Sequence, residues 1–517
     1  MKKIILFLII FLNINVLIAQ PIKFNRMHRY TVSALAPHFN QLILKNNQYI
    51  CFGHFDPQIP GYPQRISPIG AKFDSLGNVI SWFPFIDTNY NYCISSYNSD
   101  TKTNDDGYII NGFAVENQSP YTNYGFLMKL DSNLNMQWRR YYYDTDPNSL
   151  WTYPDYPFLS LKITPDNGFI AVGNRFRNSG VSTALAIKFD SLGNQQWIKT
   201  HFENKIFSRY VSVIALSSEE YVFFGGLDTT SNPINSDVVV IKTDSIGNII
   251  WQKTFGGSKG DGSMMLQNHP DGSVMLFYTK SDSAVISQGN YDGYYTLQFH
   301  KLSPLTGDTI WSLSYGDKKH NQDTYSFKVF PDGSALASGS YGNYWDVPWL
   351  LHLNREGSVD WYKEYNIVPL SGQNYFRGAI FDLQQTSDTG FVVCGQINNT
   401  DTAYGGHCWL MKIDKDGCWQ ANCDTSNNIQ SNVKIESSLE VFPNPASTEV
   451  TATYFSDIEQ GILEIYNTMG TKLMEVKLPK GQNSHKFSVA HLAKGYYKVI
   501  LKEKGILKGQ VSLLITD

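Results

Sequence analysis

The stretch "IKFDSLGNQQWIK", Ile187–Lys199, indicates the fold because similar stretches are repeated along the chain. Near-copies read "AKFDSLGNVISW" at Ala71–Trp82 and "IKTDSIGNIIWQK" at Ile241–Lys253. In each copy an apolar strand leads into an Asp-Ser turn, where Asp can accept backbone hydrogen bonds and Gly can take a positive φ. A Trp then opens the next strand. The pattern predicts a β-hairpin that recurs along the chain.

The hairpins recur every 50 to 60 residues when they are aligned on the tryptophan that closes each one. These tryptophans are Trp82, Trp138, Trp197, Trp251, Trp311, Trp361 and Trp419. Upstream of each hairpin lies a turn and a short apolar strand that ends near Gly, as in "PDNGFIAVG" at Pro165–Gly173. Such strands are apolar on both faces and must be covered on both sides, which the neighbouring sheets of a propeller provide.

The repeats predict an all-β chain whose residues 20–424 form a seven-bladed β-propeller, with four strands and one docking tryptophan in each blade. An eight-bladed ring with a degenerate blade and an open array remain alternatives. The segment Phe24–Val32 resembles the outer strands of the repeats. We therefore expect it to pair into the last blade and close the ring.

Composition and the N-terminus indicate an exported protein that does not bind nucleic acid. The net charge is −4 and only 17% of residues are charged, which excludes a basic nucleic-acid surface. Lys2, Lys3, the apolar run Ile4–Leu12 and Ala19 predict a signal peptide over residues 1–19. No later run is apolar enough for a membrane span, so we expect no transmembrane segment after the signal is removed.

Six cysteines in an exported chain can be oxidised. Cys418 and Cys423 bracket "CWQANC", and we expect a local disulfide between them. A metal site is the alternative there, but the spacing is not that of a zinc finger, and no metal is expected. Cys51 and Cys394 lie in apolar strands, where a thiol serves as a small buried hydrophobe.

One known repeat family is similar to these hairpins. "LSPLTGDTIW" at Leu302–Trp311 resembles the quinoprotein (PQQ-type) repeat, with Ser303 in place of its Asp and Thr306-Gly307 as in that family. The resemblance implies propeller architecture. It does not extend to redox catalysis, because the family covers its cofactor with a pair of adjacent cysteines and this chain has none. No cofactor is expected.

Strand order places the repeated turns on one face of the ring and every variable connection on the other. We name these the turn face and the loop face. The variable segments are rich in aromatic residues, which together with Asp and Asn suit a glycan or protein ligand. Loops that use Tyr only to pack on themselves are the alternative. The candidate ligand-binding residues are Trp151, Tyr153, Tyr156, Tyr291, Tyr294, Tyr344 and Trp345.

No nucleophile elbow, H-E-x-x-H motif or histidine cluster points to catalysis, and no catalytic residue is assigned. The acids of the variable segments are Asp144, Asp146, Asp155, Asp292 and Asp346, and any two of them could form a glycosidase dyad. The favoured function is therefore non-catalytic recognition or adhesion. The alternatives are a polysaccharide-degrading glycosidase or lyase and a structural surface-layer component.

The pattern changes after a polar linker at residues 425–436. Alternating strands over residues 437–517 predict a small immunoglobulin-like sandwich. "VFPNPAS", "LEIYNTMGTKL" and "LAKGYYKVIL" closely resemble the type A C-terminal sorting domain of the type IX secretion system of Bacteroidetes-type bacteria. The motif positions are Pro443, Asn444, Pro445, Gly470, Gly495 and Tyr496. The resemblance implies that the type IX machinery is a partner and that the protein is secreted or displayed on the outer cell surface.

Overall fold

The computed structural model describes most of the chain in segments. They are residues 23–28, 38–56, 66–95, 99, 101–117, 123–143, 158–176, 181–205, 207–216, 219–228, 236–256, 261–287, 290–316, 322–341, 347–365, 376–399, 406–419, 439–454, 461–467, 471–503 and 506–516. The signal peptide and the linker predicted from the sequence lie outside them. No helix within these segments has the length and hydropathy needed to cross a bilayer.

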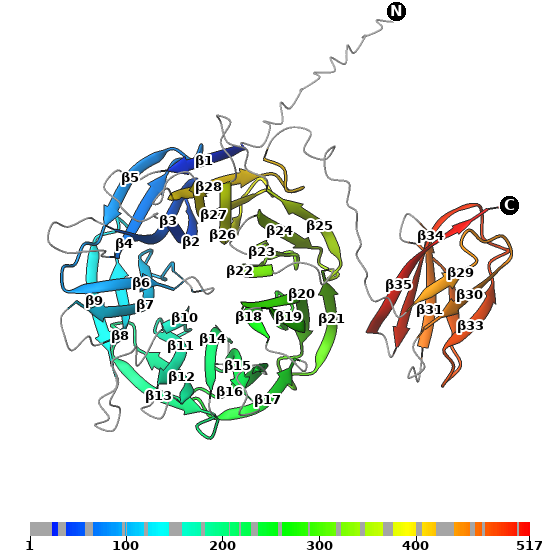
Figure 1. Cartoon of the computed structure of the whole chain (residues 1–517), viewed down its shortest axis with the longest axis horizontal. Helices are drawn as coiled ribbons and strands as arrows, with labels where there is room; N and C mark the ends of the chain where they lie inside the picture. The colour runs from blue at the N-terminus through cyan, green and yellow to red at the C-terminus, as the bar shows by residue number, and fades with distance from the viewer. Residues whose placement is uncertain are drawn as a thin grey trace, which may run out of the picture.

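The described residues before the linker form seven four-stranded antiparallel sheets arranged in a ring (Figure 1). The first contains β2 (His38–Lys45), β3 (Gln48–Phe55), β4 (Ser67–Phe73) and β5 (Val79–Pro84). The second contains β6 (Tyr90–Ile94), β7 (Tyr108–Glu116), β8 (Asn123–Leu130) and β9 (Met136–Tyr142). The third contains β10 (Phe158–Ile163), β11 (Phe169–Phe176), β12 (Ser182–Phe189) and β13 (Gln195–His201). The fourth contains β14 (Ser208–Ala215), β15 (Tyr221–Asp228), β16 (Ser236–Thr243) and β17 (Ile249–Phe255).

The remaining sheets of the ring follow the same order. The fifth contains β18 (Gly262–Asn268), β19 (Val274–Ser287), β20 (Asn290–Leu302) and β21 (Thr309–Tyr315). The sixth contains β22 (Gln322–Val329), β23 (Ala335–Tyr341), β24 (Val347–Leu353) and β25 (Val359–Glu364). The seventh contains β26 (Phe376–Gln385), β27 (Phe391–Asn399), β28 (Gly406–Ile413) and β1 (Phe24–His28). The first strand of each sheet lies nearest the centre of the ring and the last lies outermost, the arrangement of a β-propeller (Figure 1).

The N-terminal strand completes the last sheet. β1 pairs antiparallel with β28, with Phe24 opposite Lys412 and His28 opposite Cys408. This is the pairing expected from the resemblance of the segment to the outer strands. It joins the two ends of the repeat array and covers the edge of β28 that would otherwise be open.

The repeated Asp-Ser-x-Gly-Asn sequence forms a tightly bonded turn between the third and fourth strands of a sheet. Asp190 Oδ1 accepts hydrogen bonds from the backbone N–H groups of Leu192 at 2.9 Å and Asn194 at 2.8 Å. The Asn194 amide donates to Asp190 Oδ2 at 2.8 Å. Gly193 has a φ of 79°, in the left-handed region that favours glycine. The repeated residues therefore serve the turn itself.

Five of the seven repeat tryptophans pack across to the turn of the next sheet. The Trp197 ring lies 3.3 Å from the position that a β-carbon at Gly247 would occupy, and its indole N–H donates to the Ser245 carbonyl at 3.0 Å. The same juxtaposition occurs in four further pairs: Trp138 with Gly193, Trp251 with Gly307, Trp311 with Gly357, and Trp361 with Gly417. The turn glycine thus has a second role, because a side chain there would collide with the neighbouring indole.

The two ends of the array depart from this pattern. Trp82 packs on Phe39 and Phe73 of its own sheet, and Leu134 occupies the glycine position of the following turn at a φ of 71°. Trp419 follows β28 outside any outer strand and packs on the apolar cluster between the sixth and seventh sheets. Phe24 of β1 takes the place expected for a tryptophan there, because its ring lies 2.5 Å from a β-carbon built at Gly77.

The glycine that ends the second strand of a repeat accommodates an irregularity in the first strand. In the fourth sheet the register shifts between Tyr210 and Ser212, and Gly225 lies opposite Tyr210. A β-carbon on Gly225 would lie 1.8 Å from the Arg209 carbonyl oxygen. Close approach to a backbone oxygen recurs at Gly53, Gly112, Gly339 and Gly395. A β-bulge therefore explains the repeated glycine.

The repeated lysine of the third strand reaches back to the acidic turn of its own sheet. Lys188, itself buried, pairs with Asp166 at 2.7 Å. Equivalent pairs join Lys129 with Asp105, Lys242 with Glu220, Lys301 with Asp271, and Lys412 with Asp388. At Asp105 burial opposes ionisation, but the hydrogen bonds from Lys129, Thr103 and Gly107 outweigh it and lower the pKa to about 2. The pKa values of Asp166, Asp271 and Asp388 are lowered as well, so these four carboxylates are ionised at neutral pH.

We expect the ring to lose stability in acid because of these pairs. A carboxylate whose pKa is lower in the folded than in the unfolded chain stabilises the fold above the unfolded pKa, and that contribution disappears as the pH falls through the folded value. The melting temperature should therefore fall between about pH 4 and pH 2. Asp105→Asn should be less stable than the wild type at pH 7 and approach it at pH 2. An equal deficit at both pH values would contradict this account.

The residues after the linker form two sheets. One contains β29 (Glu440–Phe442), β30 (Glu449–Thr453) and β33 (Ser484–Ser488). The other contains β31 (Gly461–Asn467), β32 (Lys472–Lys477), β34 (Gly495–Glu503) and β35 (Ile506–Ile515). A buried core that includes Leu463, Val499 and Leu513 lies in this part of the chain.

The Pro-Asn-Pro motif attaches to the last strand. The Asn444 amide donates to the Ser512 carbonyl at 2.7 Å, and Asn444 Oδ1 accepts from the Leu514 N–H at 2.9 Å. Pro443 and Pro445 each follow a cis peptide bond. Of the other motif residues, Tyr496 is 66% exposed. Gly495 has a φ of 150°, and Gly470 lies outside the described segments. The motif asparagine therefore fastens the start of this module to its final strand.

Candidate functional site

Most of the predicted ligand-binding residues lie outside the described segments. These are Trp151, Tyr153, Tyr156, Tyr344 and Trp345. Tyr291 and Tyr294 are described by their backbone alone and lie in β20, opposite Ile286 and Ser283 of β19. The structure therefore brings these last two onto one hairpin of the fifth sheet, and their role stays a prediction.

That hairpin is the longest pair of strands in the ring. β19 and β20 pair from Val274 with Leu302 at the turn face to Ser287 with Asn290 at the loop face. The sequence places Tyr291 and Tyr294 in a variable loop, which is wrong because residues 290–295 continue the β-ladder. The three tyrosines of this stretch favour strand pairing, because aromatic residues are enriched in strands. A β-arm thus extends beyond the start of β18 on the loop face.

Two carboxylates meet at the base of this arm. Asp261 directly precedes β18 and Asp237 is the second residue of β16, so both lie at strand ends on the loop face. A β-carbon built on Gly256 would lie 2.5 Å from Asp261 Oδ2 and 2.6 Å from Asp237 Oδ1. Because glycine leaves that position empty, the two carboxylates face the same small space between the fourth and fifth sheets.

Asp261 also fixes the arm to the ring. Its Oδ1 accepts a hydrogen bond from the Ser281 N–H at 3.1 Å, and the residue is only 7% exposed. Ser281 lies opposite Tyr295 in the β19–β20 ladder. The carboxylate is therefore rigidly placed, and one of its oxygens is committed to the backbone while the other faces Gly256.

Two tyrosines and a third acid share this environment. Burial raises the pKa of Tyr278, and the charges of Asp261 and Asp237 add to the effect. Burial also raises the pKa of Tyr295, together with the charges of Asp323 and Asp261. Asp323, the second residue of β22, starts the neighbouring sheet on the same face. We call Asp237, Asp261 and Asp323 the acid group.

Asp323 is the member whose ionisation the fold opposes, because burial raises its pKa. An acid with a raised folded pKa destabilises the fold above that pKa, and the cost disappears as the pH falls below the unfolded value. Asp323→Asn should therefore raise the melting temperature at pH 7, and the gain should shrink as the pH is lowered toward 3. A loss of stability at pH 7 would show instead that the charge of Asp323 is needed.

The acid group was not among the acids singled out in the sequence. Asp144, Asp146, Asp155 and Asp346 lie outside the described segments, and Asp292 is described by its backbone alone. The signal that could have found the acid group is positional. Each member stands at or just before the first residues of a strand that begins on the loop face, where the topology gathers strand ends.

A second group of aromatic residues lies on the loop face of the second sheet. Tyr90 stacks on Tyr141 with ring centroids 4.5 Å apart, and the Arg139 guanidinium lies 5.6 Å from the Tyr141 ring centroid. Arg139 pairs with Asp87 at 2.6 Å, and Tyr143 is 53% exposed. Tyr90 starts β6 directly after a variable connection, so here aromatic residues gather on the face expected from the sequence.

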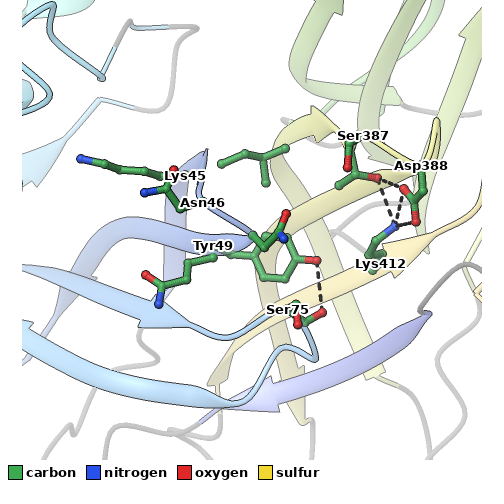
Figure 2. A pocket seen from close by; sticks show the side chains of 11 residues that line it. Lys45, Asn46, Tyr49, Ser75, Ser387, Asp388 and Lys412 are labelled. Carbon is green, nitrogen blue, oxygen red and sulfur yellow. Dashed lines mark hydrogen bonds and ion pairs between the residues drawn. The ribbon is translucent and has the colours of Figure 1, made fainter.

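A cavity of about 430 Å³ opens on the turn face, at the seam between the first and last sheets (Figure 2). It is lined by Leu44, Lys45, Asn46, Asn47, Gln48, Tyr49, Ser75, Thr386, Ser387, Asp388 and Lys412. Figure 2 shows Lys412 pointing at Asp388, which it contacts at 2.7 Å, and the Tyr49 hydroxyl donating to the Ser75 carbonyl at 3.3 Å.

The seam cavity has a structural explanation. The first sheet turns through only two residues, Asn46 at φ 51° and Asn47 at φ 60°, where the other sheets use a longer acidic turn. The short turn leaves a gap beside the seventh sheet. The single acid of the lining, Asp388, pairs with Lys412 as its counterparts do elsewhere in the ring. The charged groups of the cavity are therefore committed to the fold, and the acid group is the stronger candidate site.

No metal-binding cluster of His, Cys, Asp or Glu is present among the residues that the structure describes. Cys418 is disulfide-bonded, and the predicted partner, Cys423, lies outside the described segments.

Comparison with known proteins identifies the C-terminal module. Residues 440–514 match the family model of the secretion system C-terminal sorting domain. This domain marks proteins that the type IX secretion system delivers to the cell surface or the extracellular space. The type IX machinery is therefore a partner of the chain, and the protein is secreted. No curated protein matches the sequence.

Similar solved structures include three with distant sequences. The polysaccharide lyase Uly1 is 10% identical with a TM-score of 0.40, and the match covers 74% of this chain and 91% of that one. A protein of unknown function from Dyadobacter fermentans is 12% identical with a TM-score of 0.41, covering 76% and 99%. The GH93 α-L-arabinofuranosidase of Fusarium graminearum is 10% identical with a TM-score of 0.40, covering 63% and 95%. The chain is thus a secreted all-β protein with a β-propeller-like ring and a C-terminal type IX sorting domain.

Proposed function

We propose that the protein is a recognition module that binds extracellular glycans on its loop face. In this proposal residues 20–424 form a complete seven-bladed propeller, residues 425–436 are a linker, and the sorting domain is an immunoglobulin-like sandwich. Residues 1–19 are removed as a signal peptide, and Cys418 pairs with Cys423.

One observation carries the proposal: the carboxylates of Asp237 and Asp261 face one small space at the base of the β19–β20 arm, where the charges of Asp261 and Asp323 act on the half-buried Tyr295. Carboxylates accept hydrogen bonds from sugar hydroxyls, and tyrosine rings cover the C–H faces of pyranoses. The acid group lies on the face where the repeats differ in length, and the Tyr90–Tyr141 stack adds aromatic surface to that face. The predicted residues Tyr291 and Tyr294 would extend the site along the arm.

The proposal is tested on a glycan array with the mature secreted protein. We expect binding to a defined class of polysaccharide, and a loss of at least tenfold in affinity for Asp237→Asn. Asp237→Asn is chosen because Asp261 accepts a hydrogen bond from the arm backbone, so that a substitution of Asp261 would also disturb the arm. Glu356→Gln on the exposed turn of the sixth sheet is the matched control and should bind like the wild type. Absence of binding to every glycan would refute the proposal.

A second candidate function is polysaccharide hydrolysis, which the facing carboxylates of Asp237 and Asp261 favour. Glycosidases use two carboxyl groups, about 5 Å apart in retaining enzymes and up to about 9 Å apart in inverting ones. Incubation of the array-selected polysaccharide with the protein, followed by measurement of reducing ends, separates the two functions. Release of sugar by the wild type but not by Asp237→Asn would replace recognition with catalysis.

A further inference from the structure

Three thiols meet where the ring closes. Cys51 lies in β3 of the first sheet, and Cys394 and Cys408 lie in β27 and β28 of the seventh. All three are fully buried in one apolar cluster with Phe39 and Leu410, which spans the seam between the two sheets. The structure shows all three as free thiols, and the Cys394 thiol donates across the seam to the Phe39 carbonyl of β2 at 3.7 Å.

The packing alone does not require cysteine at these positions. Neighbouring members of the same cluster, such as Ala71 and Val392, fill the seam with ordinary apolar side chains. No three His, Cys, Asp or Glu side chains within the described segments converge on a metal position, so a thiolate metal site does not account for the thiols. The protein is delivered outside the cell, where disulfides form and persist.

We propose that Cys51 and Cys394 form a disulfide that locks the first sheet of the ring to the last. This bond would join residues from the two ends of the repeat array, whereas β1 closes the ring through backbone pairing and through the Phe24 contact with the turn of the first sheet. The inference is independent of the proposed function.

The strand register favours this pair over the alternative within the seventh sheet. Cys394 lies opposite Leu410 and Cys408 lies opposite Gln396, so these two thiols are diagonal neighbours on adjacent strands. Diagonal positions in a sheet are about 7–8 Å apart, beyond the 4.4–6.8 Å separation of Cα atoms that is usual for disulfides. This excludes a bond between Cys394 and Cys408, and Cys394 is chosen as the partner of Cys51 because its thiol also contacts the first sheet at the Phe39 carbonyl.

The bond forms by thiol–disulfide exchange with an organic disulfide, either a small molecule or the oxidised cysteine pair of an oxidoreductase. The thiolate of one cysteine attacks the incoming disulfide, forms a mixed disulfide and releases one thiolate. The other cysteine then attacks the mixed disulfide and releases the second thiol. Two protein thiols are oxidised and one organic disulfide is reduced to two thiols. The step belongs to folding, before the seam becomes buried.

The test is to denature the mature secreted protein with an alkylating reagent and no reductant, then to map its peptides by mass spectrometry. The peptides of Cys51 and Cys394 should be recovered joined and unalkylated, whereas Cys93 and Cys408 should be alkylated. Alkylation of both Cys51 and Cys394 would overturn the proposal. A link from either of them to Cys408 would overturn the assigned pair.

Unfolding provides a second readout. Reductant should lower the melting temperature of the wild type more than that of Cys51→Ala, because both proteins lose the disulfide of Cys418 and only the wild type also loses the seam bond. Cys93→Ala is the matched control and should keep the full response to reductant. An equal response in wild type and Cys51→Ala would contradict the proposal even if Cys51→Ala itself is less stable.

Discussion

Gly225→Ala is expected to prevent the ring from folding, or to lower its free energy of unfolding by roughly 4 kcal/mol or more. The added β-carbon would lie 1.8 Å from the Arg209 carbonyl oxygen, and both atoms belong to backbone that the β-ladder holds. Neither strand can move aside without breaking the pairing on both sides of the bulge. Urea unfolding of the purified variant, or its loss to the insoluble fraction, measures the effect.

Gly272→Ala is the matched control for this substitution. Gly272 has a φ of 84°, but nothing lies within 4 Å of a β-carbon built there. The control should therefore cost only about 1 kcal/mol, the price of a side chain in the left-handed region. Equal effects of the two substitutions would show that the collision with the bulge does not determine the need for glycine at position 225.

Phe24→Ala is expected to destabilise the ring by about 3–4 kcal/mol. Phe24 is 7% exposed, packs against Tyr49 with ring centroids 5.7 Å apart, and covers the Gly77 turn as the repeat tryptophans cover theirs. Phe24 also holds β1 against β28. If β1 detached, the edge of β28 would be exposed and the chains would associate. Urea unfolding and size-exclusion chromatography together measure both effects.

Trp197→Ala provides the comparison for Phe24. Trp197 makes the equivalent contact with the Gly247 turn but sits inside the array, where the flanking strands remain paired. Both variants should lose stability, and only Phe24→Ala should gain a tendency to associate. Association of Trp197→Ala to the same extent would contradict a special role for β1 in covering the edge.

The sequence predicts most of the ring because the repeated residues form local turns and contacts with the neighbouring sheet. Asp190, Gly193 and Trp197 each serve a turn or a neighbouring sheet, and their spacing therefore indicates the hairpin directly. The pairing of Phe24 with the last sheet also follows from sequence, since the segment resembles the outer strands. The sorting domain is identified from its motifs for the same reason.

What the sequence does not predict depends on contacts between distant segments. Asp237 and Asp261 meet only because Gly256 leaves room between two sheets, and neither residue belongs to a motif. The bulge that requires Gly225 lies in another strand, and Cys51 and Cys394 share an apolar cluster only once the ring has closed. The β19–β20 arm was mistaken for a loop because its length is set by pairing across the hairpin.

Hydrogen–deuterium exchange of the mature protein, with and without the polysaccharide selected on the array, tests the central claim most directly. Ligand binding on the loop face should slow exchange at Ser281 and Tyr295 of the arm and at the start of β18. The turn Asn46–Asn47 at the seam cavity should exchange at an unchanged rate. Protection confined to the seam cavity, with none at the base of the arm, would contradict the account.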